Sequence, residues 1–174
     1  MHPDTRAIIK HYQLQRLPVE GTLFTNTYRS VLENEDGSPV CTAMIGLYSD
    51  EPQSLSCFHR LTCDEIWHFY SGDPLVLVLL HPDSSSEEIV MGTDFGNGER
   101  VQFVIPARVW QAGYLKKGGR YALFGCTCAP GFTSASFEAG RAEELTAQYP
   151  DRAADIQRLN SRIEETRMPD EFAI

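Results

Sequence analysis

The chain has 174 residues, of which 42% are apolar and 22% are charged, and its net charge at pH 7 is −9. These proportions are typical of one globular domain and exclude a disordered or fibrous class. The acidic balance argues against a nucleic-acid partner, because no cluster of lysines and arginines interrupts it. We expect a cytoplasmic protein without a membrane partner, since the N-terminus lacks a signal pattern and no window reaches about 18 consecutive apolar residues.

The predicted elements begin with a short helix and continue with strands. Asp4 can cap a helix that ends before Pro18. Nine runs rich in β-branched and aromatic residues then follow, at residues 23–33, 40–48, 55–61, 65–70, 75–81, 88–92, 101–105, 109–115 and 120–129. Turn compositions separate these runs, and no helix lies between them. The pattern therefore predicts an all-β sandwich or barrel rather than a parallel α/β sheet.

Helix-forming residues return at the C-terminal end. Leu145 and Tyr149 form one apolar stripe, and Ile156, Leu159 and Ile163 form a second. We expect these helices to cover one end of the barrel. The run 75–80 is apolar at every position, which predicts that both faces of this strand are covered, by the C-terminal helices or by a partner subunit.

The stretch from Cys57 to Asp73 contains the densest group of functional side chains. Alternation along a strand places His59 and Leu61 on one face, and Glu65 and Trp67 on one face of the next strand. An inward histidine and glutamate are suited to an N and O ligand set for iron, manganese or nickel, or to an acid/base pair. His68 is out of phase with Glu65, so it points to the opposite face unless a bulge reverses it.

Other candidates lie elsewhere in the chain. Trp110 is expected near the rim of a pocket, where a flat ligand could stack on it, whereas Trp67 suits either the core or a ligand platform. Arg29 could contact an anionic ligand or form a surface ion pair with Glu33 or Asp36. The five cysteines of the chain suit reduced thiols. The two at 126 and 128 share a strand face, and they suit buried thiols better than zinc or redox use.

Two segments resemble the motifs of the cupin superfamily. His59, Glu65 and Gly72 fit the first motif, with Leu61 in place of its second metal-binding histidine. The segment "PARVWQ" resembles the second motif, with Arg108 in place of a glycine and Gln111 in place of the last metal-binding histidine.

Longer stretches resemble a group of small bacterial and fungal cupins classed as a domain of unknown function, the cupin-5 type. They are "DEIWHFYSGDPL" at 64–75, "VIPARVWQA" at 104–112 and "FGCTCAPGF" at 124–132, with Glu20-Gly21 near the N-terminus. The chain departs from the group at Thr22, where a second glycine is usual. The resemblance implies a jelly-roll double-stranded β-helix, a homodimer, and a pocket in the barrel mouth. We expect one cupin domain over 1–174, with the barrel at about 20–138 and a C-terminal helical segment at about 140–167.

These features predict a protein that binds a small polar cyclic ligand, sugar-like or nucleobase-like, without a cofactor. As an enzyme it would be of isomerase or epimerase type. Glu65 would then move a proton together with His59 or His68, and Gln111 and Tyr121 would orient the ligand.

Two alternatives from other classes stay open. One is a metal-dependent, dioxygenase-like cupin that uses His59, Glu65 and Gln111 as ligands. The other is a non-catalytic sensing module that stacks its ligand on Trp110 and hydrogen-bonds it to Gln111.

Overall fold

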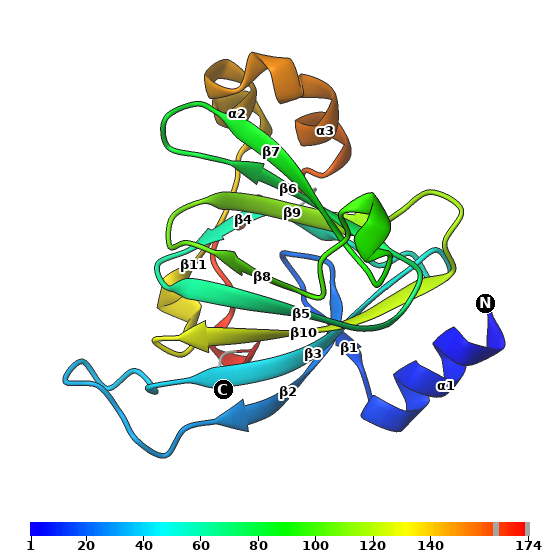
Figure 1. The fold of residues 1–174 in the computed structure, drawn as a ribbon. Coiled ribbons are helices and arrows are strands. Elements are labelled where there is room, and N and C mark those ends of the chain that lie inside the picture. The colour runs from blue at the N-terminus through cyan, green and yellow to red at the C-terminus, as the bar shows by residue number, and fades with distance from the viewer. Residues whose placement is uncertain (162–163, 173–174) are drawn as a thin grey trace.

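Two antiparallel sheets face each other in the computed structural model, which describes residues 1–161 and 164–172 (Figure 1). The first sheet has the order β1-β2-β3-β10-β5-β8 and the second has the order β11-β4-β9-β6-β7. The strands of the first sheet are β1 (Gln15–Arg16), β2 (Leu23–Arg29), β3 (Thr42–Ser49), β10 (Tyr121–Ala129), β5 (Asp64–Gly72) and β8 (Gln102–Ile105). Those of the second are β11 (Phe137–Ala139), β4 (Ser56–Leu61), β9 (Trp110–Leu115), β6 (Leu75–Leu80) and β7 (Ser86–Met91). The predicted all-β jelly-roll class is confirmed.

The main core lies between the sheets. Tyr48, Trp67 and Phe124 project from the first sheet and pack with Leu77 of the second. The Trp67 and Phe124 rings stack with their centroids 4.6 Å apart. Each of the nine runs predicted as strands overlaps a strand of the structure, because their alternating or fully apolar patterns match the faces that become buried.

Strand β6 is buried on both faces, as its composition predicts. Its outward residues Val76, Val78 and Leu80 pack against the C-terminal helices α2 (Ala142–Gln148) and α3 (Ala153–Arg158). These helices therefore cover the outward face of the second sheet rather than one end of the barrel. Because the chain itself covers β6, this strand gives no support to a partner subunit, and the homodimer stays a prediction.

Helix α1 (Pro3–Tyr12) lies beside the first sheet at the N-terminal end of the chain (Figure 1). Its N-cap is His2, whose Nδ1 accepts a hydrogen bond from the Asp4 backbone, so the predicted cap Asp4 lies in the first turn instead. Asp4 still favours the helix there, because a carboxylate in the first turn complements the helix dipole.

The described residues also form four short 3₁₀ helices, which are η1 (Phe95–Asn97), η2 (Ser134–Ser136), η3 (Pro150–Arg152) and η4 (Asp170–Phe172). Of the second apolar stripe predicted at the C-terminal end, Ile156 and Leu159 are fully buried, and Ile163 lies outside the described residues. No helix among the described residues combines the length and the apolar composition needed to cross a membrane.

Candidate functional site

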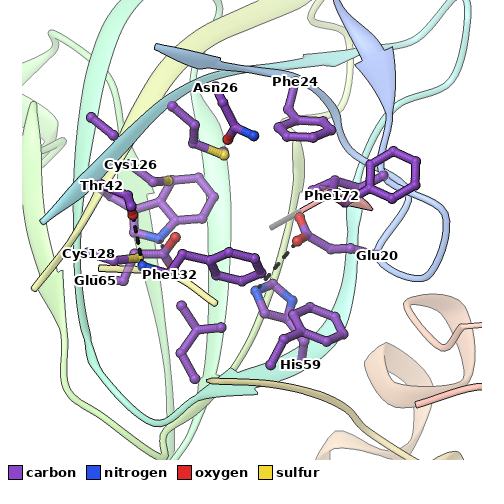
Figure 2. A pocket seen from close by; sticks show the side chains of 16 residues that line it. Glu20, Phe24, Asn26, Thr42, His59, Glu65, Cys126, Cys128, Phe132 and Phe172 are labelled. Carbon is purple, nitrogen blue, oxygen red and sulfur yellow. Dashed lines mark hydrogen bonds and ion pairs between the residues drawn. The ribbon is translucent and has the colours of Figure 1, made fainter. Parts of the chain in front are cut away.

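A cavity of about 50 Å³ opens between the sheets (Figure 2). Most of its wall is apolar, formed by Leu17, Phe24, Ala43, Met44, Leu61, Trp67, Phe132, Phe137 and Phe172, together with the thiols of Cys126 and Cys128. Its polar side chains are Glu20, Asn26, Thr42, His59 and Glu65. A buried water needs about 10–15 Å³ of such volume, so the cavity suits a few waters or a small ligand.

His59 reaches this cavity from β4, which contains a bulge. The pairing of β4 with β9 shifts between Ser56 and His59, so both of these side chains face the interior although they are three residues apart. The His59 Nδ1 lies 2.8 Å from the Cys57 carbonyl oxygen. A carbonyl can only accept, so Nδ1 carries the hydrogen and Nε2 is the bare nitrogen of the neutral ring.

Glu20 lies beside His59 on one side of the cavity (Figure 2). Its Oε2 is 3.9 Å from His59 Nε2, and the two side chains are almost completely buried. Its Oε1 accepts hydrogen bonds from Thr22 and from Ser56, the latter at 2.7 Å. Ser56 also contacts the hydroxyl of the fully buried Tyr48. This hydroxyl network leaves Oε2 as the carboxyl oxygen that faces the imidazole.

Glu65 lies on the other side of the cavity, joined to residues of the two cupin-like motifs (Figure 2). Its Oε2 accepts hydrogen bonds from Gln111 Nε2 at 2.7 Å and from Trp67 Nε1 at 3.1 Å. Trp67 Nε1 is also 3.2 Å from Gln111 Oε1. The pairing His59↔Gln111 between β4 and β9 places the amide opposite the histidine, which explains why the two motifs meet here.

Burial dominates the electrostatics of this site. The pKa of Glu65 is raised above its ordinary value, because desolvation and the nearby Glu20 outweigh the opposing effects of His59 and the Gln111 hydrogen bond. Burial also raises the pKa of Cys126 and of Tyr48 well above the ordinary values, with the buried carboxylates adding to the effect. The neutral forms of these groups are therefore favoured.

Cys126 and Cys128 both line the cavity, as their two-residue spacing predicts. The pKa of Cys128 is raised by its hydrogen bond with Cys63 and by burial. A thiol that holds its proton is a poor nucleophile. The arrangement therefore favours buried, unreactive thiols over the redox use considered from the sequence.

Four of the predicted site residues meet at this cavity. His59, Glu65 and Trp67 line it, and Gln111 lies directly behind Glu65. Leu61 lines the cavity on the same strand face as His59, as alternation predicts.

The structure does not bring the other four predicted residues to the cavity wall. His68 points outward from β5, where its Nε2 lies 3.4 Å from the Thr127 hydroxyl, because the local strand keeps regular alternation. Trp110 is next to the inward Gln111 and so faces outward, where Arg60 stacks on its ring at 4.4 Å. A rim position for Trp110 is therefore not observed.

Tyr121 and Arg29 have structural surroundings of their own. Tyr121 packs at the start of β10 against the small cluster that contains Leu14 and Leu23. Arg29 donates a hydrogen bond to Glu33 at 3.2 Å, which is the surface pair considered from the sequence.

Glu20 and Phe172 are cavity residues that the sequence analysis did not propose for the site. Glu20 lies in the loop between β1 and β2, where no strand periodicity indicates its direction. The one feature of the sequence that could have identified Glu20 is the resemblance of Glu20-Gly21 to the small cupin group. Phe172 lies near the C-terminus, outside every motif, and no signal in the sequence identifies it.

Comparisons with known proteins agree with this architecture. The sequence model of the Cupin_5 family, described as cupin superfamily (DUF985), matches residues 6–140. The protein is thus a cupin by fold, and the chain belongs to the Cupin_5 family. No curated protein matches the chain.

Solved structures include two similar chains of nearly the same extent. A protein from Shewanella oneidensis is 30% identical, with a TM-score of 0.82 over 92% of this chain and 98% of its own. A hypothetical protein from Leishmania major is 27% identical, with a TM-score of 0.80 over 90% of this chain and 98% of its own. Oxalate decarboxylase from Bacillus subtilis is 12% identical, with a TM-score of 0.53 over 90% of this chain and 40% of its own, which shows the shared fold alone.

The side chains at the cavity do not fit the metal centre typical of cupins. Leu61 and Gln111 replace two of its histidines, and both ends of the Gln111 amide are engaged by Glu65 and Trp67. Within the described part of the chain, no three His, Cys, Asp or Glu side chains are arranged to share a metal ion. The donor set is therefore weak for a transition metal.

Proposed function

We propose that this cupin binds a small cyclic ligand in the cavity without a metal and moves a proton on that ligand. The observation that carries the proposal is the fixed orientation of His59: the Cys57 carbonyl engages Nδ1, so Nε2 is the nitrogen that faces the Glu20 carboxylate inside a largely apolar cavity. A buried imidazole with a carboxylate beside it is suited to accept a proton, because the carboxylate stabilises the imidazolium that forms.

Glu65 supplies the complementary group. Burial favours its protonated form, and a protonated carboxyl group can donate a proton or a hydrogen bond to the ligand. In the proposed step, His59 Nε2 takes a proton from the ligand and Glu65 gives one to another position of the ligand; a proton then passes from His59 back to Glu65, which restores both groups for the next turnover. The net result is a shift of a proton within the ligand, so no oxidant or reductant is needed.

The cavity wall favours the nucleobase-like ligand over the sugar-like one. Phe24, Phe132 and Phe137 offer apolar surface, whereas His59 with Glu20 on one side and Glu65 on the other offer polar groups. A planar ring with a polar edge can contact both regions, since aromatic side chains stack on planar rings. A hexose is polar around its whole ring and would leave more of its hydroxyl groups unpaired against this wall.

The test is proton exchange in deuterated water, followed by NMR on a panel of pyrimidines, purines and hexoses. Wild-type protein should bind a planar ring and exchange one of its hydrogens. His59→Gln and Glu65→Gln should abolish exchange while saturation-transfer NMR still detects binding. The matched control is His68→Gln, which should retain exchange because His68 lies on the outer face.

Other outcomes distinguish the alternatives. Binding without exchange in the wild type would favour the non-catalytic module. About one equivalent of a transition metal per chain by elemental mass spectrometry, lost in Glu65→Gln, would overturn the metal-free proposal and favour the dioxygenase-like one.

A further inference from the structure

The wall of the cavity is completed by a segment outside the part of the chain that matches the family. The Cupin_5 match ends at residue 140, yet Phe172 of η4 lines the cavity. Its ring lies 6.4 Å from that of Phe24, and Figure 2 shows both rings on the side of the cavity that holds Glu20.

Residues 164–172, which we name the C-terminal strap, are attached to the barrel at several points. The Thr166 carbonyl oxygen accepts a hydrogen bond from the Ala139 backbone at 2.8 Å. Met168 is only 3% exposed and packs in the cluster that includes Leu61 and Phe137. Asp170 accepts a hydrogen bond from the Ser134 hydroxyl. These contacts fix the strap against the barrel, so the position of Phe172 follows from packing and not from its own ring alone.

We propose that Phe172 is a specificity-determining residue of the cavity, and that the strap adapts a cavity otherwise lined by residues within the family match to a ligand with an apolar face. Phe172 adds aromatic surface close to the Glu20 and His59 side of the cavity. A ligand would therefore lie between this side, where the aromatic rings adjoin Glu20 and His59, and Glu65 on the opposite side. The class of ligand rests on the proposed function, whereas the contribution of Phe172 to the cavity wall is independent of it.

The wall is tested first with acrylamide, a small neutral quencher of tryptophan fluorescence. Trp67 lines the cavity and is 2% exposed, and in a Trp110→Phe background it is the remaining tryptophan. In this background Phe172→Ala should raise the acrylamide quenching constant by about twofold or more, because truncation of a packed aromatic ring opens space. The matched control is Phe95→Ala, which removes a ring that is 68% exposed and lies outside the cavity wall.

An unchanged quenching constant in a folded Phe172→Ala variant would overturn the proposal. If circular dichroism shows that the alanine variant is unfolded, Phe172→Leu is used instead. This variant keeps apolar bulk on the strap, so the expected rise in the quenching constant is smaller.

Specificity is then measured by saturation-transfer NMR with uracil and glucose. Phe172→Ala should lower the uracil signal relative to the glucose signal, and an unchanged ratio where uracil binds would reject the specificity role.

The two proposals fail in different ways. If acrylamide quenching rises but neither the wild type nor the variant binds uracil or another planar ring, the strap still forms the wall and the proposed ligand class is wrong. If planar rings bind and quenching does not respond to Phe172, the proposed function stands and the role of the strap is wrong.

Discussion

Gln111 donates a hydrogen bond to Glu65 across 2.7 Å, and this contact joins the two cupin-like motifs at the cavity. In the typical cupin pattern a histidine at the position of Gln111 would help to hold a metal. Here the amide is 1% exposed and is aimed at a carboxyl group that burial makes easier to protonate. With glutamine in place of histidine, a candidate metal ligand is thus replaced by an amide that holds the Glu65 carboxyl group in place.

The raised pKa of Glu65 predicts a pH-dependent effect of Glu65→Gln on stability. Between the ordinary carboxyl value of 4.5 and the raised folded value, the unfolded chain has lost the proton while the folded protein keeps it. Wild-type stability therefore falls in this window as pH rises, by at most about 1.4 kcal/mol per pH unit from this group. Gln cannot ionise, so the variant should gain stability relative to the wild type from pH 4.5 upward.

Urea unfolding at a series of pH values measures this difference. Glu35→Gln, which alters an exposed carboxylate in the loop between β2 and β3, should show no such trend. A Glu65→Gln effect that is independent of pH between 4 and 8 would contradict burial as the dominant influence on Glu65.

Strand periodicity predicts most of the strands, and it also predicts whether several of the proposed site residues face inward or outward. Regular alternation correctly places Glu65 and Trp67 inward and His68 outward, because β5 and β8 pair without a shift in this stretch. The same rule places Trp110 outward, because its neighbour Gln111 faces inward. The predicted position of Trp110 at the pocket rim is incompatible with this alternation.

The remaining part of the site depends on contacts that no local pattern encodes. Glu20 enters the cavity from a loop, held by hydroxyl groups from residues distant in sequence, such as Ser56. Ser56 itself faces inward because of the β4 bulge, which alternation alone cannot locate. Phe172 reaches the cavity through the packing of the whole C-terminal strap. The tertiary structure determines which of these side chains reach the cavity. From the sequence alone, they can be identified only where a motif resembles that of a known family.

The hydroxyl network around Glu20 predicts a high cost for Gly113→Ala. A Cβ atom at Gly113 would lie 2.3 Å from the Tyr48 hydroxyl, which contacts Ser56 within this network. Overpacking of this kind costs about 1–3 kcal/mol. Gly96→Ala is the control, because its nearest atom would be 3.5 Å away and Gly96 lies in the exposed 3₁₀ helix η1. Urea unfolding should also show that Tyr48→Phe and Gly113→Ala are less than additive, and full additivity would place the strain elsewhere.

Arg108 occupies the glycine position of the second cupin motif and has a left-handed backbone with φ of 69°. Its backbone donates a hydrogen bond to the Leu61 carbonyl at 2.7 Å, which keeps the turn in place. Arg108→Gly should therefore raise the free energy of unfolding by up to about 1 kcal/mol, since glycine adopts this conformation without steric cost. Arg108→Ala should change it by less than about 0.5 kcal/mol, because alanine keeps the strain. A loss of stability in the glycine variant would contradict this explanation.

The hydrogen bond from His59 to Cys57 predicts a single tautomer for the neutral imidazole. Because the carbonyl oxygen lies 2.8 Å from Nδ1, the hydrogen should be on Nδ1 and the lone pair on Nε2. Long-range proton-nitrogen NMR correlations of ¹⁵N-labelled protein above neutral pH should show Nε2 as the unprotonated nitrogen, with the resonance assigned by its loss in His59→Gln. The exposed His11 is the control and should show a mixture of tautomers. A hydrogen on Nε2 would leave His59 unable to take a proton from a ligand in the cavity, and the proposed role of His59 as a base would be wrong.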